Sequence, residues 1–253
     1  MWWWPDRPPS RAATTPRTWR PSAPPPAAEP ETEPFYMTSS SIARRAGGWP
    51  AAIVFDLDGT LVHAAPDIHA ALNRMLASHD LGPLDLEAVT LMIGAGPAKL
   101  VERALKALGE TPDEARVLAL TDDYTPLLAE QGQKLCRLYD GVEGTLRGLA
   151  ARGVKLGLCT NKPEAIARQL LVHYGIENLF GAVTGFDAAR PRKPDAAPLL
   201  ASLDALGVGI ESALYVGDSI TDVETGHNAG VPVVAVSYGY SKTPARQLGA
   251  DMV

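Results

Sequence analysis

Short apolar runs alternate with longer amphipathic stretches from residue 51 onward, and this alternation constrains the fold more than any other feature. Aliphatic runs of this length are typical of strands buried on both faces of a parallel sheet. The predicted strands are AAIVF (51–55), VKLGLC (154–159), ALYVG (213–217) and VVAV (233–236), with a weaker candidate, GAVTG, at 181–185. Helices are predicted between them, at 144–151, 163–174, 195–206 and 221–229. Such alternation predicts right-handed crossovers and an α/β fold with a doubly wound parallel sheet.

One long interval interrupts this alternation. Between Val62 and Tyr139 apolar residues recur three and four positions apart throughout, and no strand pattern is visible. We therefore predict an all-helical cap at 62–139, inserted into a Rossmann-like core formed by residues 49–61 and 140–253.

The first 48 residues differ from the rest in composition. They hold ten of the chain's 22 prolines and show neither helical nor strand periodicity, which predicts a disordered, proline-rich extension at 1–48. Its WWW run ends at Pro5, so we expect no secretory signal. Met37 is a second candidate start of translation.

Composition excludes several classes of partner. The net charge of -6, without a cluster of Lys and Arg, argues against nucleic-acid binding. No apolar run approaches the roughly 20 residues that span a bilayer. Cys136 and Cys159 lack the spacing of a zinc or redox motif. We expect a soluble, cytoplasmic protein, monomeric or homodimeric, that binds a small molecule and neither nucleic acid nor membrane.

Polar side chains follow three of the predicted strands, at the point where each strand ends. Ligands of a doubly wound sheet bind beyond the carboxyl ends of its strands, so we expect these side chains to share one crevice. They are Asp56 and Asp58, then Thr160 and Asn161, then Asp218, Ser219 and Asp222, with Lys193 ahead of the following helix.

Carboxylates gathered at a strand end repel each other unless a cation compensates them. A few carboxylates completed by water suit Mg²⁺ acting with a phosphate group, which indicates a small phosphorylated metabolite as the partner. Thr160 and Lys193 can offset the charge of a phosphoryl group. Of the two acids Asp56 and Asp58, one can attack phosphorus as a nucleophile, and the other can protonate the leaving oxygen.

Four motifs in order, DLDGTLV, TNKP, RKPD and GDSITD, resemble those of the haloacid dehalogenase superfamily, and the likeness covers nearly all of residues 51–253. The resemblance implies that Asp56 is the nucleophile and Asp58 the general acid/base. It implies that Thr160 and Lys193 stabilise the phosphate. Asp58 points to the phosphatase branch, because the dehalogenases proper lack this second acid.

The same resemblance implies a Mg²⁺ site. Its ligands would be the Asp56 side chain, the Asp58 backbone carbonyl and Asp218, with Asp222 supporting the metal shell. The helical insert resembles a C1 cap. Stretches such as MIGAGPAKLVERAL and VGDSITDVETGHNAG are similar to bacterial phosphoglycolate phosphatases, which implies hydrolysis of 2-phosphoglycolate. His63 departs from the family pattern, which commonly has an acid there.

Alternatives remain at this point. The same acids serve phosphatases of pyrophosphate or sugar phosphates, and a phosphoglucomutase, which retains the phosphoryl group; a non-catalytic binding protein could also use this scaffold. In the cap, IGAGPAKL lacks the ending of a phosphate-binding loop. We hypothesise that Gly94 opens a helix beginning near Pro97, so that Lys99 faces the carboxylate of the substrate; a plain turn between helices is the alternative.

Overall fold

A five-stranded parallel sheet forms the core of the protein. The computed structural model describes residues 48–187 and 191–253, so the predicted disorder of the N-terminal extension lies outside the described residues, apart from residue 48. The strand order is β5-β4-β1-β6-β7. The strands are β1 (Ala52–Phe55), β4 (Lys155–Pro163), β5 (Phe180–Phe186), β6 (Ala213–Gly217) and β7 (Val233–Ala235). The predicted doubly wound sheet is confirmed, including the weak candidate strand, which is β5.

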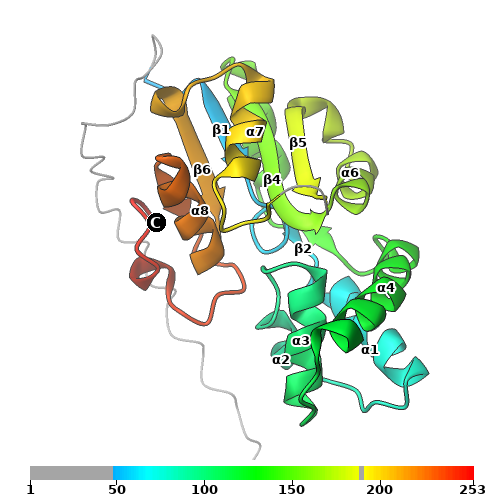
Figure 1. The fold of residues 1–253 in the computed structure, drawn as a ribbon. Coiled ribbons are helices and arrows are strands. Elements are labelled where there is room, and N and C mark those ends of the chain that lie inside the picture. The colour runs from blue at the N-terminus through cyan, green and yellow to red at the C-terminus, as the bar shows by residue number, and fades with distance from the viewer. Residues whose placement is uncertain (1–47, 188–190) are drawn as a thin grey trace, which may run out of the picture. The chain divides into compact units, whose positions relative to one another are not determined.

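Strand β1 lies at the centre and pairs with β4 and β6 in parallel register. Its side chains alternate between two apolar clusters, Ile53 and Phe55 on one face and Ala52 and Val54 on the other. Helices α5 and α6 pack against the first face, while α7 and α8 cover the second (Figure 1). Their bounds are Val142–Ala151 for α5, Glu164–His173 for α6, Ala197–Leu206 for α7 and Ile220–Ala229 for α8. Burial on both faces explains why the strands read as continuous apolar runs.

Four helices follow the first strand in the chain. They are α1 (Ala65–Ser78), α2 (Leu86–Thr90), α3 (Pro97–Ala107) and α4 (Glu114–Gln131). Two short strands flank them, β2 (Val62–His63) and β3 (Arg137–Leu138), which pair antiparallel. The expectation of no strand between Val62 and Tyr139 was therefore wrong, because a two-residue strand is too short to leave a periodic pattern.

A buried carboxylate ties the start of α1 to the chain beyond α4. Asp67 accepts hydrogen bonds from Gln131 Nε2 at 2.9 Å, from the backbone of Leu135 at 3.0 and 3.1 Å and from the backbone of Cys136 at 2.8 Å. Because these donors satisfy the buried charge, the polar group fixes the two ends of the helical insertion beside each other.

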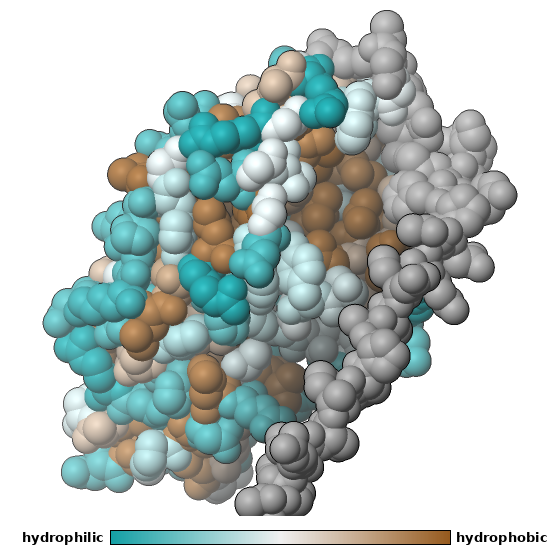
Figure 2. Space-filling model, turned by 180° about the vertical axis from the view of Figure 1, so that it is seen from behind, coloured by the Kyte–Doolittle hydropathy of each residue, from teal (hydrophilic) through white to brown (hydrophobic). Residues whose placement is uncertain are grey.

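The surface carries both hydrophilic and hydrophobic side chains. On the face shown in Figure 2, teal hydrophilic side chains lie between brown hydrophobic areas. Within the described ranges, no helix combines the length and the apolar character that crossing a membrane requires.

Candidate active site

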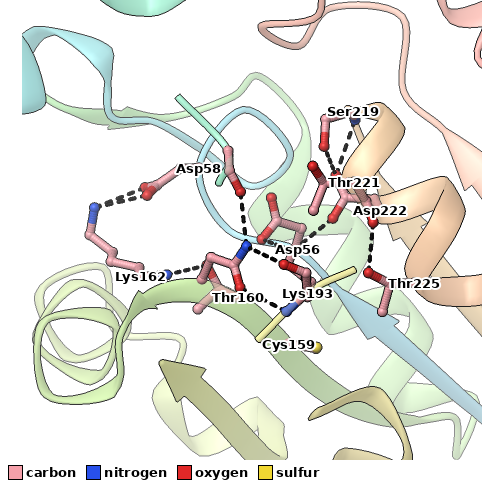
Figure 3. Close-up of polar contacts among 12 residues, drawn as sticks. Asp56, Asp58, Cys159, Thr160, Lys162, Lys193, Ser219, Thr221, Asp222 and Thr225 are labelled. Atoms are coloured by element: carbon pink, nitrogen blue, oxygen red, sulfur yellow. Dashed lines mark hydrogen bonds and ion pairs between the residues drawn. The ribbon is translucent and has the colours of Figure 1, made fainter. Parts of the chain in front are cut away.

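Asp56 and Lys193 meet in the buried centre of the site. Asp56 directly follows β1, and its backbone N–H still donates to the Val216 carbonyl at 2.8 Å, so its carboxylate emerges where the strand ends. The Lys193 ammonium donates to Asp56 Oδ1 at 2.8 Å and to Asp222 Oδ1 at 2.7 Å (Figure 3). It also donates to the Tyr215 hydroxyl at 2.9 Å. These three acceptors use all three N–H donors of the ammonium group.

Burial and charge set the protonation of this cluster. Burial raises the pKa of Asp56 to about 6, although the Lys193 ammonium opposes the shift. Burial and the neighbouring carboxylates of Asp222 and Asp56 raise the pKa of Asp218 well above its usual range. Burial would also raise the pKa of Asp222, but the charge and hydrogen bond of Lys193 have the larger effect, so the pKa of Asp222 is lowered. Without a metal, Asp56 and Asp218 are therefore the carboxyls of this cluster that hold a proton most readily.

The arrangement around Asp218 fits a divalent cation. One oxygen each of Asp56, Asp218 and Asp222 lies within 4.8 Å of the others. Asp218 Oδ2 accepts from the Tyr240 backbone N–H at 2.6 Å. Within the described part of the chain, Asp56 Oδ2 and Asp218 Oδ1 accept no hydrogen bond. Two buried, donor-free carboxylate oxygens are the hard ligands that Mg²⁺ prefers.

Asp222 differs from these two carboxylates because donors already saturate it. Its Oδ1 accepts from Lys193 and from Tyr215 at 2.9 Å. Its Oδ2 accepts from the Asp218 backbone at 3.2 Å and from the backbone and hydroxyl of Ser219 at 3.1 and 2.6 Å. A carboxylate has about four lone-pair positions, so five donors leave it none for a metal. Asp222 thus holds Lys193 and, through the capping box of α8, the Asp218 loop.

Asp58 lies on the other side of Asp56 and pairs with a lysine that the sequence analysis missed. The Lys162 ammonium donates to Asp58 Oδ1 and Oδ2 at 3.0 and 2.9 Å (Figure 3). The two side chains are only 4% and 12% exposed. The sequence signal that could have identified Lys162 is its position in the TNKP motif, where this cation directly follows two predicted site residues.

Thr160 and Asn161 lie in the same region, near the end of β4. The Thr160 hydroxyl is buried and accepts from the Lys162 backbone N–H at 3.2 Å. Asn161 accepts from the Lys193 backbone N–H at 3.0 Å and donates to the Lys193 carbonyl at 3.2 Å and to the Gly94 carbonyl at 3.1 Å. Asn161 therefore connects the segment that carries Lys193 to the helical insertion.

Gly94 and Lys99, both expected to contact substrate, have different positions. Gly94 has a left-handed φ of 114° and lies beside the site through its bond to Asn161. The Lys99 ammonium is paired with Glu102 at 2.6 Å and lines a different depression of the surface, beside Arg192. Helix α3 does begin at Pro97, but the structure does not bring Lys99 together with the other predicted site residues.

A cavity of about 40 Å³ connects the acids to the helical insertion. Asp56, Asp58 and Lys162 belong to its polar side. The insertion supplies an apolar wall made of Ile68, Ile93, Leu100, Tyr124 and Leu128. A space of this size, with acids at one end and apolar side chains at the other, suits a small leaving group.

An aromatic pair that the sequence analysis did not single out supports Asp218. The Tyr240 hydroxyl accepts from the Ala65 backbone N–H at 3.0 Å and lies 3.3 Å from His63 Nδ1. The Tyr238 hydroxyl donates to the Thr60 carbonyl at 2.9 Å. The loop after β7 is thereby attached to the start of α1 and to the loop after β1.

Comparisons with known proteins agree with this geometry. A family model described as haloacid dehalogenase-like hydrolase matches residues 53–236. The phosphoglycolate phosphatase of Rhodospirillum rubrum is 48% identical over 209 residues, which cover 79% of this chain and 85% of that protein. The phosphoglycolate phosphatase of Cereibacter sphaeroides strain ATCC 17025 is 45% identical over 196 residues, covering 78% and 89%.

A solved structure is similar as well. The crystal structure of a predicted phosphoglycolate phosphatase from Haemophilus somnus 129PT matches with a TM-score of 0.73 and 32% identity, covering 80% of this chain and 92% of that one.

Proposed function

Because the chain belongs to the haloacid dehalogenase-like hydrolase family, we propose that it is a Mg²⁺-dependent phosphomonoesterase that hydrolyses 2-phosphoglycolate to glycolate and phosphate. The observation that carries the proposal is the buried triplet of Asp56, Lys193 and Asp222 beside Asp218, at the end of the central strand. The names of the relatives support the choice of substrate.

Asp56 is the nucleophile in this proposal. One of its carboxylate oxygens attacks phosphorus, the bond from phosphorus to the ester oxygen breaks, and an aspartyl phosphate forms. Lys193 donates to Asp56 Oδ1 at 2.8 Å and so orients the attacking carboxylate. Thr160, buried at the end of β4, provides a hydroxyl beside the phosphoryl oxygens.

Asp58 is the general acid and base. As a carboxylic acid it gives its proton to the leaving ester oxygen, and as a carboxylate it then takes a proton from the water that hydrolyses the aspartyl phosphate. The Lys162 ammonium keeps this side chain facing the cavity in a fixed orientation. The apolar side chains of the insertion keep bulk water from the reacting atoms.

The metal would be held by Asp56 and Asp218, with the Asp58 backbone carbonyl as the further ligand that the family resemblance implies. Mg²⁺ would neutralise the two carboxylates and withdraw charge from the phosphoryl group. Asp222 takes part indirectly, because it orients the Asp218 loop through its hydrogen bonds to Ser219.

Release of inorganic phosphate tests the proposal. The purified protein is given 2-phosphoglycolate, pyrophosphate, glucose 6-phosphate and β-glucose 1-phosphate, each with Mg²⁺ and with EDTA. We expect the highest kcat/KM for 2-phosphoglycolate and no turnover in EDTA. Preference for another ester would overturn the substrate, isomerisation without phosphate release would indicate a mutase, and inertness toward all four would indicate a binding protein.

A further inference from the structure

We propose that Lys162 and Tyr124 form the subsite that binds the carboxylate of the leaving group. This inference rests on the proposed function and deepens it, because it assigns the recognition of the substrate to two residues. It replaces the hypothesis that Lys99, on the helical insertion, binds this carboxylate.

Lys162 has hydrogen-bonding capacity left over. Its ammonium is buried and donates to both oxygens of Asp58, which uses two of its three N–H groups. Among the residues that the structure describes, no acceptor takes the third. Lys162 is also the one cationic side chain among the described residues that line the cavity. A buried cation with an unused donor indicates that an anion completes it.

Tyr124 supplies a second unused donor from the opposite wall. It lies on α4, is 1% exposed and lines the same cavity. Its hydroxyl makes no hydrogen bond to any described residue. Burial and the charge of Asp58 raise the pKa of Tyr124 above its usual value, so the hydroxyl keeps its proton. Because Tyr124 lines the cavity, an acceptor that enters there can accept a hydrogen bond from this hydroxyl.

The length of 2-phosphoglycolate brings its carboxylate to this pair. One methylene group separates the carboxylate from the ester oxygen that Asp58 protonates. Lys162 contacts Asp58 directly, so an anion one carbon away from that oxygen lies within reach of its ammonium. The two oxygens of the carboxylate match the two unused donors.

The rest of the cavity wall offers no compensation for such a charge. Ile68, Ile93 and Leu100 are apolar, and an unpaired carboxylate against them would be strongly disfavoured. A neutral leaving group, by contrast, would leave the Lys162 donor unpaired. The subsite therefore selects esters with a carboxylate on the adjacent carbon over esters of sugars.

A ratio of two substrates tests the assignment. 2-Phosphoglycolate is compared with 2-hydroxyethyl phosphate, which has the same length and a hydroxymethyl group in place of the carboxylate. For Lys162→Met we expect the ratio of their kcat/KM values to fall about 10- to 100-fold, as for a lost charge-assisted hydrogen bond. For Tyr124→Phe, which removes one oxygen atom, we expect a fall of about 3- to 10-fold. Lys106→Met, on an exposed residue of α3, is the control and should keep the ratio.

Several outcomes would overturn the inference. Equal losses on both substrates in Lys162→Met would mean that the lysine acts only through Asp58. A fall of the ratio in Lys99→Met alone would assign the carboxylate to the insertion. Circular dichroism reports whether Lys162→Met folds. Even if it does not, an unchanged ratio of the two kcat/KM values in Tyr124→Phe would exclude Tyr124 from the subsite. If the wild-type protein releases phosphate from neither ester, the proposed function itself fails; if it hydrolyses both equally, only the subsite fails.

Discussion

Lys193 Nζ and Asp56 Oδ1 lie 2.8 Å apart in the interior, although 137 residues separate them in the sequence. The same ammonium lies 2.7 Å from Asp222, so one buried cation serves two carboxylates. A buried ion pair of this kind contributes little net stability while it is complete, but it is costly to break.

Replacing Lys193 by Met should therefore affect both stability and turnover. Asp56 and Asp222 would lose their shared cation, and we expect the free energy of unfolding in urea to drop by about 3–5 kcal/mol without metal. We expect kcat to fall at least about 100-fold, because the nucleophile loses its orienting partner. Mg²⁺ should restore part of the stability by supplying positive charge. An unchanged urea midpoint and kcat would contradict the ion-pair account.

Two glycines provide a matched test of the Asp218 position. A Cβ built on Gly239 would collide with the Asp218 side chain, whereas a Cβ on Gly144, inside α5, meets nothing within 4 Å. We expect Gly239→Ala to weaken Mg²⁺ binding at least about tenfold in calorimetry, as for a displaced metal ligand. Gly144→Ala should leave binding unchanged and stabilise the protein by about 0.5–1 kcal/mol. Equal Mg²⁺ affinities in the two variants would argue that Asp218 is no ligand.

Metal affinity should depend on pH in a defined direction. Burial raises the pKa of Asp56 to about 6, so below that pH the metal-free folded protein holds a proton that the unfolded chain, with an ordinary value of 3.8, releases. Metal-free stability should thus fall as pH rises from about 4 to 6. Mg²⁺ displaces that proton, so its affinity should rise by about tenfold per pH unit below 6, and more steeply wherever Asp218, whose pKa burial also raises, still holds its own proton. Calorimetric titrations between pH 5 and 8 measure this, and a flat profile would contradict it.

Much of the core could be predicted because its determinants are local. A strand covered on both faces must be apolar along its whole length, so β1 and β6 can be recognised in the sequence as continuous apolar runs. The residues that follow these two parallel strands necessarily meet at one edge of the sheet. The structure brings Asp56 and Asp218 close together there, as that reasoning predicts. The donor count of Asp222, by contrast, depends on Tyr215 and Lys193, whose approach no local pattern encodes.

The insertion was less predictable for a physical reason. Periodicity identifies a helix face but not the partner that the face meets. Lys99 was therefore assigned to the site, although it forms an ion pair with Glu102, three residues later. Lys162 was missed because a single lysine after a strand is usually solvated; only the fold brings Asp58 within 3.0 Å of it. Tyr124 likewise has no signal beyond helical spacing.

The most direct test of the central claim is to trap the phosphoryl group on Asp56. The protein is mixed with 2-phosphoglycolate and Mg²⁺, quenched in acid within one turnover, digested and sequenced by mass spectrometry. We predict a phosphorylated peptide in which the group lies on Asp56, is lost on treatment with hydroxylamine, and is absent from Asp56→Asn, which should also release no phosphate. Phosphate release at the wild-type rate by Asp56→Asn, or a phosphoryl group on another residue, would contradict the account.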